Sequence, residues 1–284
     1  MILPHIEPAE LEALDLAAIE ALAVEMAQLA GAQIAASLGR TLAVRYKMLD
    51  AAEEAVYRDP VSEIDQSVER LIRDQLSERF PDHGIIGEED EPVRVGASDF
   101  VWIIDPVDGT TNFVNGYPLF AASIGVAYRG RPVVGAVWCS TSHALRSGVY
   151  HARSGGLLAF DQQPIAGVDR KAVRRRIVGL PRVPAGAEIG FEARQSGSAA
   201  IECAFVAAGL LAGARFDAPN AWDVAGGIPL LEAAKATVLT KAPDGEWADF
   251  AGFGPVDAPG PAWRRPLAIG DRTVAEALSR LTLA

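Results

Sequence analysis

Residues 102–113 read WIIDPVDGTTNF, and this stretch sets two carboxylates directly behind an apolar run. The run predicts a short buried β-strand that delivers Asp105 at its C-terminal end, where α/β sheets bind ligands. Pro106 cannot continue the hydrogen-bond ladder, so we expect the chain to turn there and to bring Asp108 back beside Asp105. The motif therefore predicts two converging acids at one edge of a sheet.

The chemistry of such a pair favours a cation. Two carboxylates that meet repel each other unless protons or cations lie between them. No His or Cys occurs in the stretch, so ligation by oxygen alone favours Mg²⁺ or a similar hard cation. Gly109 permits a close backbone approach, and the N–H groups of Gly109 and Thr110 are suited to a phosphate oxygen. An ordinary surface turn is the alternative explanation of the same residues.

Three further acids are each weak evidence for a metal site, and their order along the chain strengthens that evidence. Glu88 follows another short apolar run, Asp223 opens a predicted helix, and Asp65 stands in the first turn of a helix predicted over 62–79. A solvated turn, a helix N-cap and a favourable first-turn charge explain them equally simply. Their joint occurrence with the Asp105 motif favours a common site.

The remaining pattern alternates between helix and strand without a strict βαβ period, which favours a layered mixed α/β fold. Ser62 and Asp65 form a capping signal for the second helix. The predicted helices cover 9–37, 62–79, 222–235 and 272–282; the predicted strands cover 85–86, 100–104, 120–128, 133–139, 149–151, 177–180 and 236–240; 40–60 is predicted as a loop or hairpin. We expect the strands over 120–128 and 133–139 to form a hairpin.

Composition excludes several classes of function. The chain has 284 residues, 50% of them hydrophobic and 22% charged, which is an ordinary globular balance. Its net charge of −11 argues against nucleic-acid binding and against docking on anionic lipid. The first eight residues lack the basic start of a signal peptide, and no long uncharged apolar stretch follows. We expect a cytoplasmic protein whose Cys139 and Cys203 are buried free thiols, with a disulfide as the alternative.

Together these motifs resemble those of the inositol monophosphatase family, within the superfamily of lithium-sensitive, Mg²⁺-dependent phosphatases. The resemblance implies an α/β (mixed α+β) fold, a layered αβαβα sandwich with an N-terminal α+β lobe over about 1–165 and a C-terminal α/β lobe over about 166–284. It also implies a homodimer. The matching pieces stand in the family's order: PVSEID at 60–65, GEE at 87–89, WIIDPVDGTTNF at 102–113, GSAA at 197–200 and WDVAGG at 222–227.

The resemblance also implies two or three Mg²⁺ ions in each site. Glu88, Asp105 and the carbonyl of Val107 would hold the first ion. Asp105, Asp108 and Asp223 would hold the second. Paired ions of this kind stabilise both the attacking and the leaving oxygen of an in-line displacement.

The expected catalytic residues follow from the same resemblance. Glu88 and Thr110 would position the attacking water, and Asp65 would polarise the hydroxyl of Thr110. The implied reaction is hydrolysis of a phosphomonoester without a phosphoenzyme.

The expected substrate contacts come from two segments. Gly109 and Thr110 would face the phosphate, and the segment Gly197, Ser198 and Ala199 would face the alcohol. Asp217 is the best match for an acid that family members place before the Trp-Asp pair. It stands one residue too close to that pair and is shorter than the usual Glu, and a loop N-cap or a solvent-exposed carboxylate is its alternative role.

Inositol 1-phosphate is the expected substrate, because TTNF followed by GYPLF resembles the inositol branch. Histidinol phosphate and fructose 1,6-bisphosphate are alternatives, since a fold does not fix the alcohol. A non-catalytic binding protein on the same scaffold is the least favoured hypothesis. In relatives the loop corresponding to 40–60 contributes a basic residue, for which Lys47 is the candidate.

Overall fold

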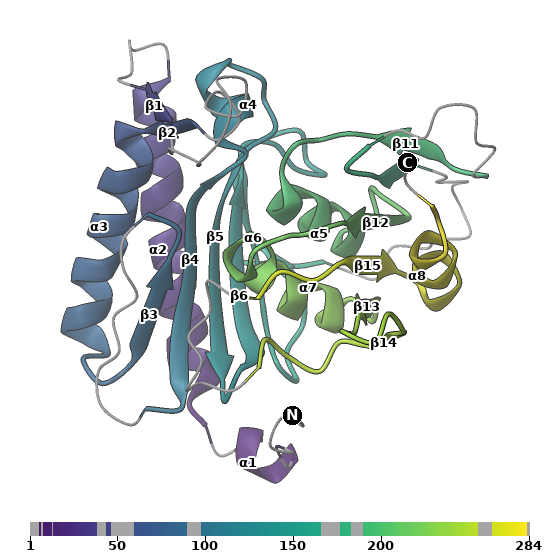
Figure 1. Cartoon of the computed structure of the whole chain (residues 1–284). Coiled ribbons are helices and arrows are strands. Elements are labelled where there is room, and N and C mark those ends of the chain that lie inside the picture. The colour runs from purple at the N-terminus through teal and green to yellow at the C-terminus, as the bar shows by residue number, and fades with distance from the viewer. Residues whose placement is uncertain are drawn as a thin grey trace.

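Five alternating layers of helix and sheet make up the protein (Figure 1). This arrangement confirms the αβαβα sandwich expected from the sequence. The computed structural model describes residues 6, 8–12, 14–38, 44–46, 60–89, 98–165, 177–182, 190–254 and 263–282.

The larger sheet has seven strands, of which the first two are parallel and the following neighbours antiparallel. In spatial order they are β3 (Gly84–Gly87), β4 (Phe100–Asp108), β5 (Ala121–Tyr128), β6 (Arg131–Cys139), β7 (Gly148–Arg153), β8 (Ala159–Phe160) and β9 (Gln163–Pro164). The predicted hairpin is confirmed as β5 and β6. Arg129 and Gly130 join them with φ of 48° and 80°, which suits a tight two-residue turn.

The apolar run of β4 is buried on both faces of this sheet. Val101 and Ile103 belong to the core shared with the central helices, whereas Trp102 and Ile104 belong to the core beneath the N-terminal helices. Side chains alternate between the faces of a strand, so a strand covered on both sides needs a continuous apolar sequence. The run before Asp105 therefore anchors the acids in the middle of the molecule.

The outer layer consists of α2 (Leu16–Ser37) and α3 (Glu63–Arg79), with the short α1 (Pro8–Glu12) before them. The prediction of one helix over 9–37 was wrong. A new helix starts after Asp15, whose carboxylate accepts a hydrogen bond of 3.1 Å from the N–H of Ala18. Such an N-cap satisfies a backbone donor that the first helical turn leaves without a partner.

The central layer lies between the two sheets and consists of α5 (Ala199–Ala207), α6 (Ala221–Ala225) and α7 (Gly227–Ala233). The single helix predicted over 222–235 is thus two helices joined at Gly226. Gly125 and Gly135 face each other on β5 and β6, and a Cβ on Gly135 would lie 2.1 Å from the carbonyl oxygen of Gly226. The joint therefore rests directly on the sheet, which fixes the position of Asp223 in α6.

The smaller sheet has six strands and is covered on its far face by α8 (Arg272–Ser279). In spatial order the strands are β11 (Glu192–Arg194), β10 (Ile177–Gly179), β12 (Gly213–Phe216), β15 (Leu267–Gly270), β13 (Thr237–Lys241) and β14 (Trp247–Asp249). Leu267 and Ile269 face the central helices while Ala268 faces α8, so this sheet also has two buried faces. The lobe boundary expected near residues 165 and 166 stays a prediction.

The structure also describes the two cysteines and a short pair of strands near the N-terminal helices. Cys139 and Cys203 are free and buried, as predicted. Strands β1 (Val44–Tyr46) and β2 (Pro60–Ser62) pair antiparallel. Lys47 and the side chain of Ser62 lie outside the described residues. In the described part of the chain, no helix has the length and apolar character needed to span a bilayer.

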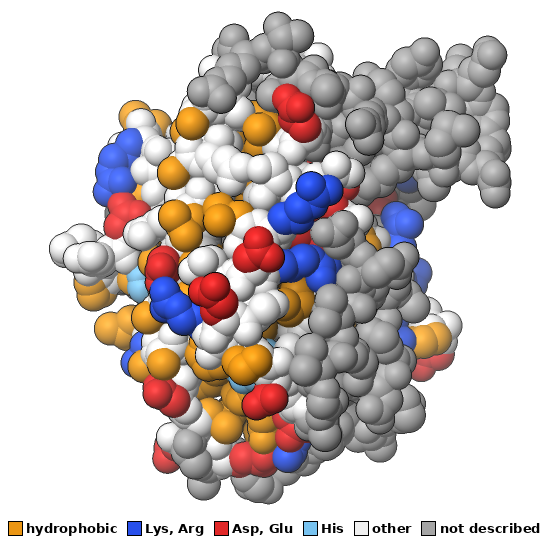
Figure 2. Space-filling view, turned by 90° about the vertical axis from the view of Figure 1, so that its left-hand side faces the viewer, with side chains coloured by type: hydrophobic (Ala, Val, Ile, Leu, Met, Phe, Trp, Pro, Cys, Tyr) orange, Lys and Arg blue, Asp and Glu red, His pale blue; other side chains and the backbone are white. Residues whose placement is uncertain are grey.

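The face covered by α2 and α3 carries mixed charges (Figure 2). Acidic and basic side chains are scattered there among apolar ones, and the described part of this face gathers no basic patch. The expectation that the protein does not bind nucleic acid stays a prediction.

A charged cluster ties α2 to β7. The carboxylate of Glu20 bonds to Nδ1 of His151 at 2.7 Å and to the guanidinium of Arg153. Nε2 of His151 lies 2.5 Å from the carbonyl oxygen of Asp161. Both ring nitrogens therefore face acceptors, which requires the doubly protonated, cationic imidazole. Burial by itself would lower the pKa of His151, but the bonds to Glu20 and Asp161 raise it above the usual 6.5.

We predict that Glu20→Ala lowers the free energy of unfolding by about 3 kcal/mol, because it removes one partner of a largely buried ion pair. The raised pKa of His151 gives a stabilisation that is complete below pH 6.5 and is lost as pH rises through the folded-state value. Urea unfolding at pH 5.5 and 8.5 measures both effects. Glu25→Ala is the control, since Glu25 pairs with Arg79 on the surface at 3.5 Å. Equal losses for the two variants would contradict the prediction.

Candidate active site

A bulge in β4 brings the two acids of the central motif to one side of the sheet. Opposite β5, Asp105 pairs with Ser123 and Asp108 pairs with Ala121, so three steps along β4 match two along β5. Residues three apart on a regular strand point to opposite faces, and the extra residue resets this alternation. The expected turn at Pro106 was therefore wrong: the strand continues to Asp108, and the bulge accommodates the missing N–H of proline.

Asp105 is the centre of a group of buried acids. It is 1% exposed, and its fully buried Oδ1 has no hydrogen-bond partner among the residues that the structure describes. Burial raises its pKa well above the usual value, and the negative charges of Glu88, Asp108, Asp223 and Asp65 raise it further. The five acids expected to share a site thus act on one another electrostatically.

Asp108 is held by the N-terminal end of α5. Its Oδ2 accepts hydrogen bonds from Oγ of Ser198 at 2.5 Å and from the N–H of Ala200 at 2.7 Å, and its Oδ1 accepts one from the N–H of Ala199 at 3.3 Å. Burial raises the pKa of Asp108 to about 6 although these donors lower it. The segment predicted to face the alcohol therefore also orients a predicted metal ligand.

Asp223 has a local role as well as a place in the acidic group. It closes a capping box at the start of α6, because its Oδ2 accepts a hydrogen bond of 2.8 Å from the N–H of Asn220. Burial, followed by the charge of Asp108, raises its pKa to about 8. Asn220, not Asp223, is the N-cap residue.

Thr110 bridges two other predicted site residues. Its Oγ1 lies 3.0 Å from Oδ1 of Asp65 and 2.9 Å from the carbonyl oxygen of Val107. A hydroxyl has one proton and donates to one of these acceptors at a time. The geometry agrees with the expected pairing of Asp65 and Thr110.

The two segments expected to contact substrate lie against each other. Gly109, the N-cap of α4 (Thr110–Val114), has a φ of +87°, and a Cβ there would lie 3.1 Å from the carbonyl oxygen of Gly197. Asn112 fastens the contact, because its Nδ2 donates to the carbonyl oxygen of Ser196 at 2.7 Å and to that of Leu119 at 2.6 Å. Glycine is needed at 109 both for its backbone conformation and for this approach.

The donor set fits a hard cation. Asp105 carries a buried oxygen without a partner among other carboxylates, and a divalent ion would satisfy that oxygen and offset the repulsion. In the described part of the chain, no three acidic, His or Cys side chains stand close enough to bind one ion together. Asp108 and Asp223 instead accept hydrogen bonds from Ser198 and Asn220.

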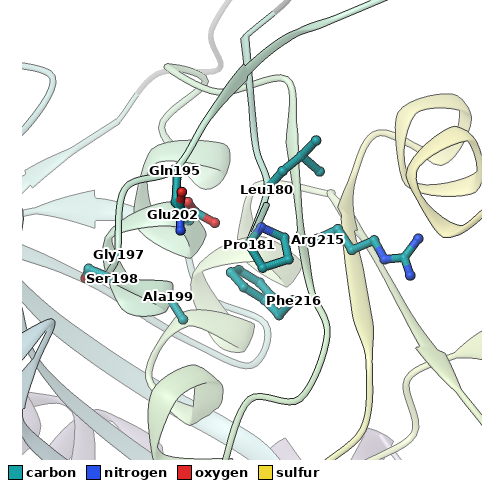
Figure 3. A pocket seen from close by; sticks show the side chains of 9 residues that line it. All are labelled: Leu180, Pro181, Gln195, Gly197, Ser198, Ala199, Glu202, Arg215 and Phe216. Atoms are coloured by element: carbon teal, nitrogen blue, oxygen red, sulfur yellow. The ribbon is translucent and has the colours of Figure 1, made fainter. Parts of the chain in front are cut away.

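A pocket of about 200 Å³ opens beside this group (Figure 3). Gln195 and Glu202 lie on the side of the Gly197–Ala199 segment, and an apolar wall lies opposite. The residues that line the pocket are Leu180, Pro181, Gln195, Gly197, Ser198, Ala199, Glu202, Arg215 and Phe216.

Asp217, predicted as a substrate contact, has other partners. It forms ion pairs with Arg215 at 3.3 Å and with Arg182 at 3.7 Å. It is not among the described residues that line the pocket. Of the predicted substrate residues, the structure therefore brings together the glycine segments but leaves Asp217 outside.

Sequence reasoning missed three residues that shape the site: Asn112, Ser196 and Glu202. Asn112 stands inside the quoted TTNF motif, so its amide was visible as a polar group beside the acids. Glu202 is the one charged residue in the apolar helix AAIECAFVA at 199–207, and an isolated charge in such a helix is a signal in its own right.

Comparison with known protein families matches residues 15–259 to the model described as the inositol monophosphatase family. The chain belongs to the inositol monophosphatase family. The chloroplastic phosphatase IMPL1 of Arabidopsis thaliana is 30% identical over 208 residues, which are 68% of this chain and 56% of the plant protein. An inositol-1-monophosphatase of Rhizobium meliloti is 34% identical over 190 residues, 62% of this chain and 70% of the relative.

The fold agrees with solved structures of this family. The extragenic suppressor protein suhB of Bartonella henselae has a TM-score of 0.73 at 26% identity, with 93% of this chain and 97% of that one covered. Membership in the family, together with relatives named as phosphatases, assigns the chain to the phosphoric monoester hydrolases.

We predict that the metal-free protein becomes more stable as pH falls from 8.5 to 6. The pKa values of Asp223 and Asp108 are about 8 and 6 when folded and about 3.8 when unfolded, so the folded state retains protons that the unfolded state has released. Melting temperatures in EDTA measure this slope. Excess Mg²⁺ should remove the pH dependence of the melting temperature that is due to these acids and leave the pH dependence that is due to His151. The same slope with and without Mg²⁺ would contradict the prediction.

Proposed function

We propose that the protein is a Mg²⁺-dependent phosphomonoesterase that hydrolyses the phosphate ester of a small alcohol with water. The observation that carries this proposal is the buried, unpartnered oxygen of Asp105 among four other acids, beside the Thr110–Asp65 pair. Membership in a family of phosphatases supports it. The Mg²⁺ and its stoichiometry of two or three ions are part of the proposal.

The ligands proposed for Mg²⁺ are Glu88, Asp105, the carbonyl of Val107, Asp108 and Asp223. When bound, such paired ions lower the pKa of water and offset the charge that develops on the attacking and leaving oxygens. Asp108 and Asp223 would exchange some of their present hydrogen bonds for this role. Their donors, Ser198 and Asn220, would then remain beside the ligands and orient them.

Thr110 and Asp65 orient the attacking water in this proposal. When the hydroxyl of Thr110 donates to Asp65, its lone pairs are free to accept a hydrogen bond from the water. Glu88 takes a second hydrogen bond from the same water. Holding the nucleophile in line with phosphorus accounts for much of the rate of such reactions.

The phosphate would lie against the backbone of Gly109 and Thr110. The N–H groups at this turn supply hydrogen bonds to phosphate oxygens without adding a positive side chain. The alcohol would then extend toward the Gly197–Ala199 segment, which touches Gly109.

The alcohol itself is the open part of the proposal. The name of the rhizobial relative supports inositol 1-phosphate as the first substrate to test. The ion pairs of Asp217 argue for an alcohol other than inositol, because Asp217 is the acid that the resemblance assigns to binding a polyol and it already pairs with two arginines. Histidinol phosphate and fructose 1,6-bisphosphate therefore belong in the same assay.

We predict that Asp108→Asn lowers kcat for phosphate release by at least about a hundredfold in Mg²⁺, because it removes a charge proposed to bind metal. Chelation with EDTA should abolish the wild-type activity, and added Mg²⁺ should restore it. Asp249→Asn is the control, since it removes an equal charge from a surface ion pair with Arg272. Undiminished phosphate release by folded Asp108→Asn would refute the proposed site.

A further inference from the structure

We infer that Glu202, rather than Asp217, recognises the alcohol half of the substrate, and that the pocket favours the phosphate monoester of an amino alcohol with an apolar body. This inference rests on the proposed phosphatase function and names its substrate class.

The position of Glu202 follows from the helix that carries it. It stands four residues after Ser198, the N-cap of α5, and thus projects from the same side of the helix. Glu202 is among the residues that line the pocket, although it is only 5% exposed. A Cβ on Gly179 would lie 2.4 Å from Oε2 of Glu202, so the carboxylate packs directly against the backbone of β10.

Among the described residues, Glu202 has a hydroxyl partner and no cationic one. Its Oε1 accepts a hydrogen bond of 2.6 Å from Oγ of Ser196. Over the ranges that the structure describes, no Lys, Arg or His forms an ion pair with it. A buried carboxylate without a cationic partner is costly, and burial raises the pKa of Glu202 to about 7. A bound cation would supply the missing partner.

Asp217 is the contrasting case. Two arginines already pair with it, and the guanidinium of Arg215 also donates to the carbonyl oxygen of Leu278 at 3.0 Å. In Figure 3 the side chain of Arg215 extends away from the other labelled side chains. The arginine therefore anchors β12 to the end of α8 and does not present its charge to the pocket.

The apolar wall of the pocket favours an alcohol whose body, away from the charged group, is apolar. Pro181 and Phe216 lie opposite the polar side formed by Glu202 and Gln195 (Figure 3). A ring with a hydroxyl on every carbon would leave hydroxyls without partners against this wall, whereas an apolar body would bury surface there. One polar and one apolar side thus match a molecule with an ammonium group and a hydrocarbon or aromatic part. Histidinol phosphate belongs to this class, and inositol 1-phosphate does not.

A matched pair of esters tests the inference. The probes are 2-amino-3-phenylpropyl phosphate and 3-phenylpropyl phosphate, which differ only by the amino group, together with inositol 1-phosphate. With wild-type protein in Mg²⁺ we expect kcat/KM for the amino ester to exceed that for each of the other two at least about tenfold. Glu202→Gln should remove this preference and change kcat/KM for 3-phenylpropyl phosphate by less than about twofold, because the amide still accepts the bond from Ser196.

Ser196→Ala separates recognition of charge from positioning. It removes the hydrogen bond to Glu202 and keeps the carboxylate, so we expect the preference for the amino ester to persist. Absence of a preference in the wild type, or an equal loss on all three esters in Glu202→Gln, would overturn the inference. Hydrolysis of 4-nitrophenyl phosphate in Mg²⁺ distinguishes that result from failure of the proposed function, which would abolish activity on this ester too.

Discussion

Buried carboxylates of like charge repel one another around Asp105, and the layers of the fold hold them close together. Asp105 lies within β4, a strand buried on both faces, where water screens its charge poorly, and the charges of four other acids raise its pKa. Holding these groups together lowers the free energy of unfolding of the metal-free protein. An arrangement that is unfavourable without a cation is informative, because a positive ion or protons must offset it.

The layered architecture explains how acids from distant parts of the chain come close enough to act electrostatically on Asp105. Strand β4 supplies Asp105 and Asp108 through its bulge, and α3 supplies Asp65 from the outer layer. From the central layer, Asp223 reaches the site because facing glycines let the joint of α6 and α7 rest directly on the sheet. The site thus lies where the outer helices, the large sheet and the central helices meet.

The sequence predicted the buried strand and its acids, but it did not predict the bulge in β4 or the partners of Asp217 and Glu202. The apolar run and the acids after it predicted the buried strand and the acidic group, whereas the contact between Gly109 and the Gly197 segment was first seen in the structure. The bulge at Pro106 was not predictable, because a missing N–H is compatible with either a turn or an unpaired ladder position. The partners of Asp217 and Glu202 depend on how β12 and β10 pack against α5, and no local pattern encodes that packing.

Calorimetric titration of Mg²⁺ into EDTA-treated protein measures whether the acids around Asp105 bind divalent cations. The account predicts at least two ions bound to each chain, with protons released at pH 7 because the pKa of Asp223 is about 8. It also predicts that Asp105→Asn, which keeps the shape of the side chain, removes most of this binding. Absence of binding to folded wild-type protein, or unchanged binding by Asp105→Asn, would contradict the account.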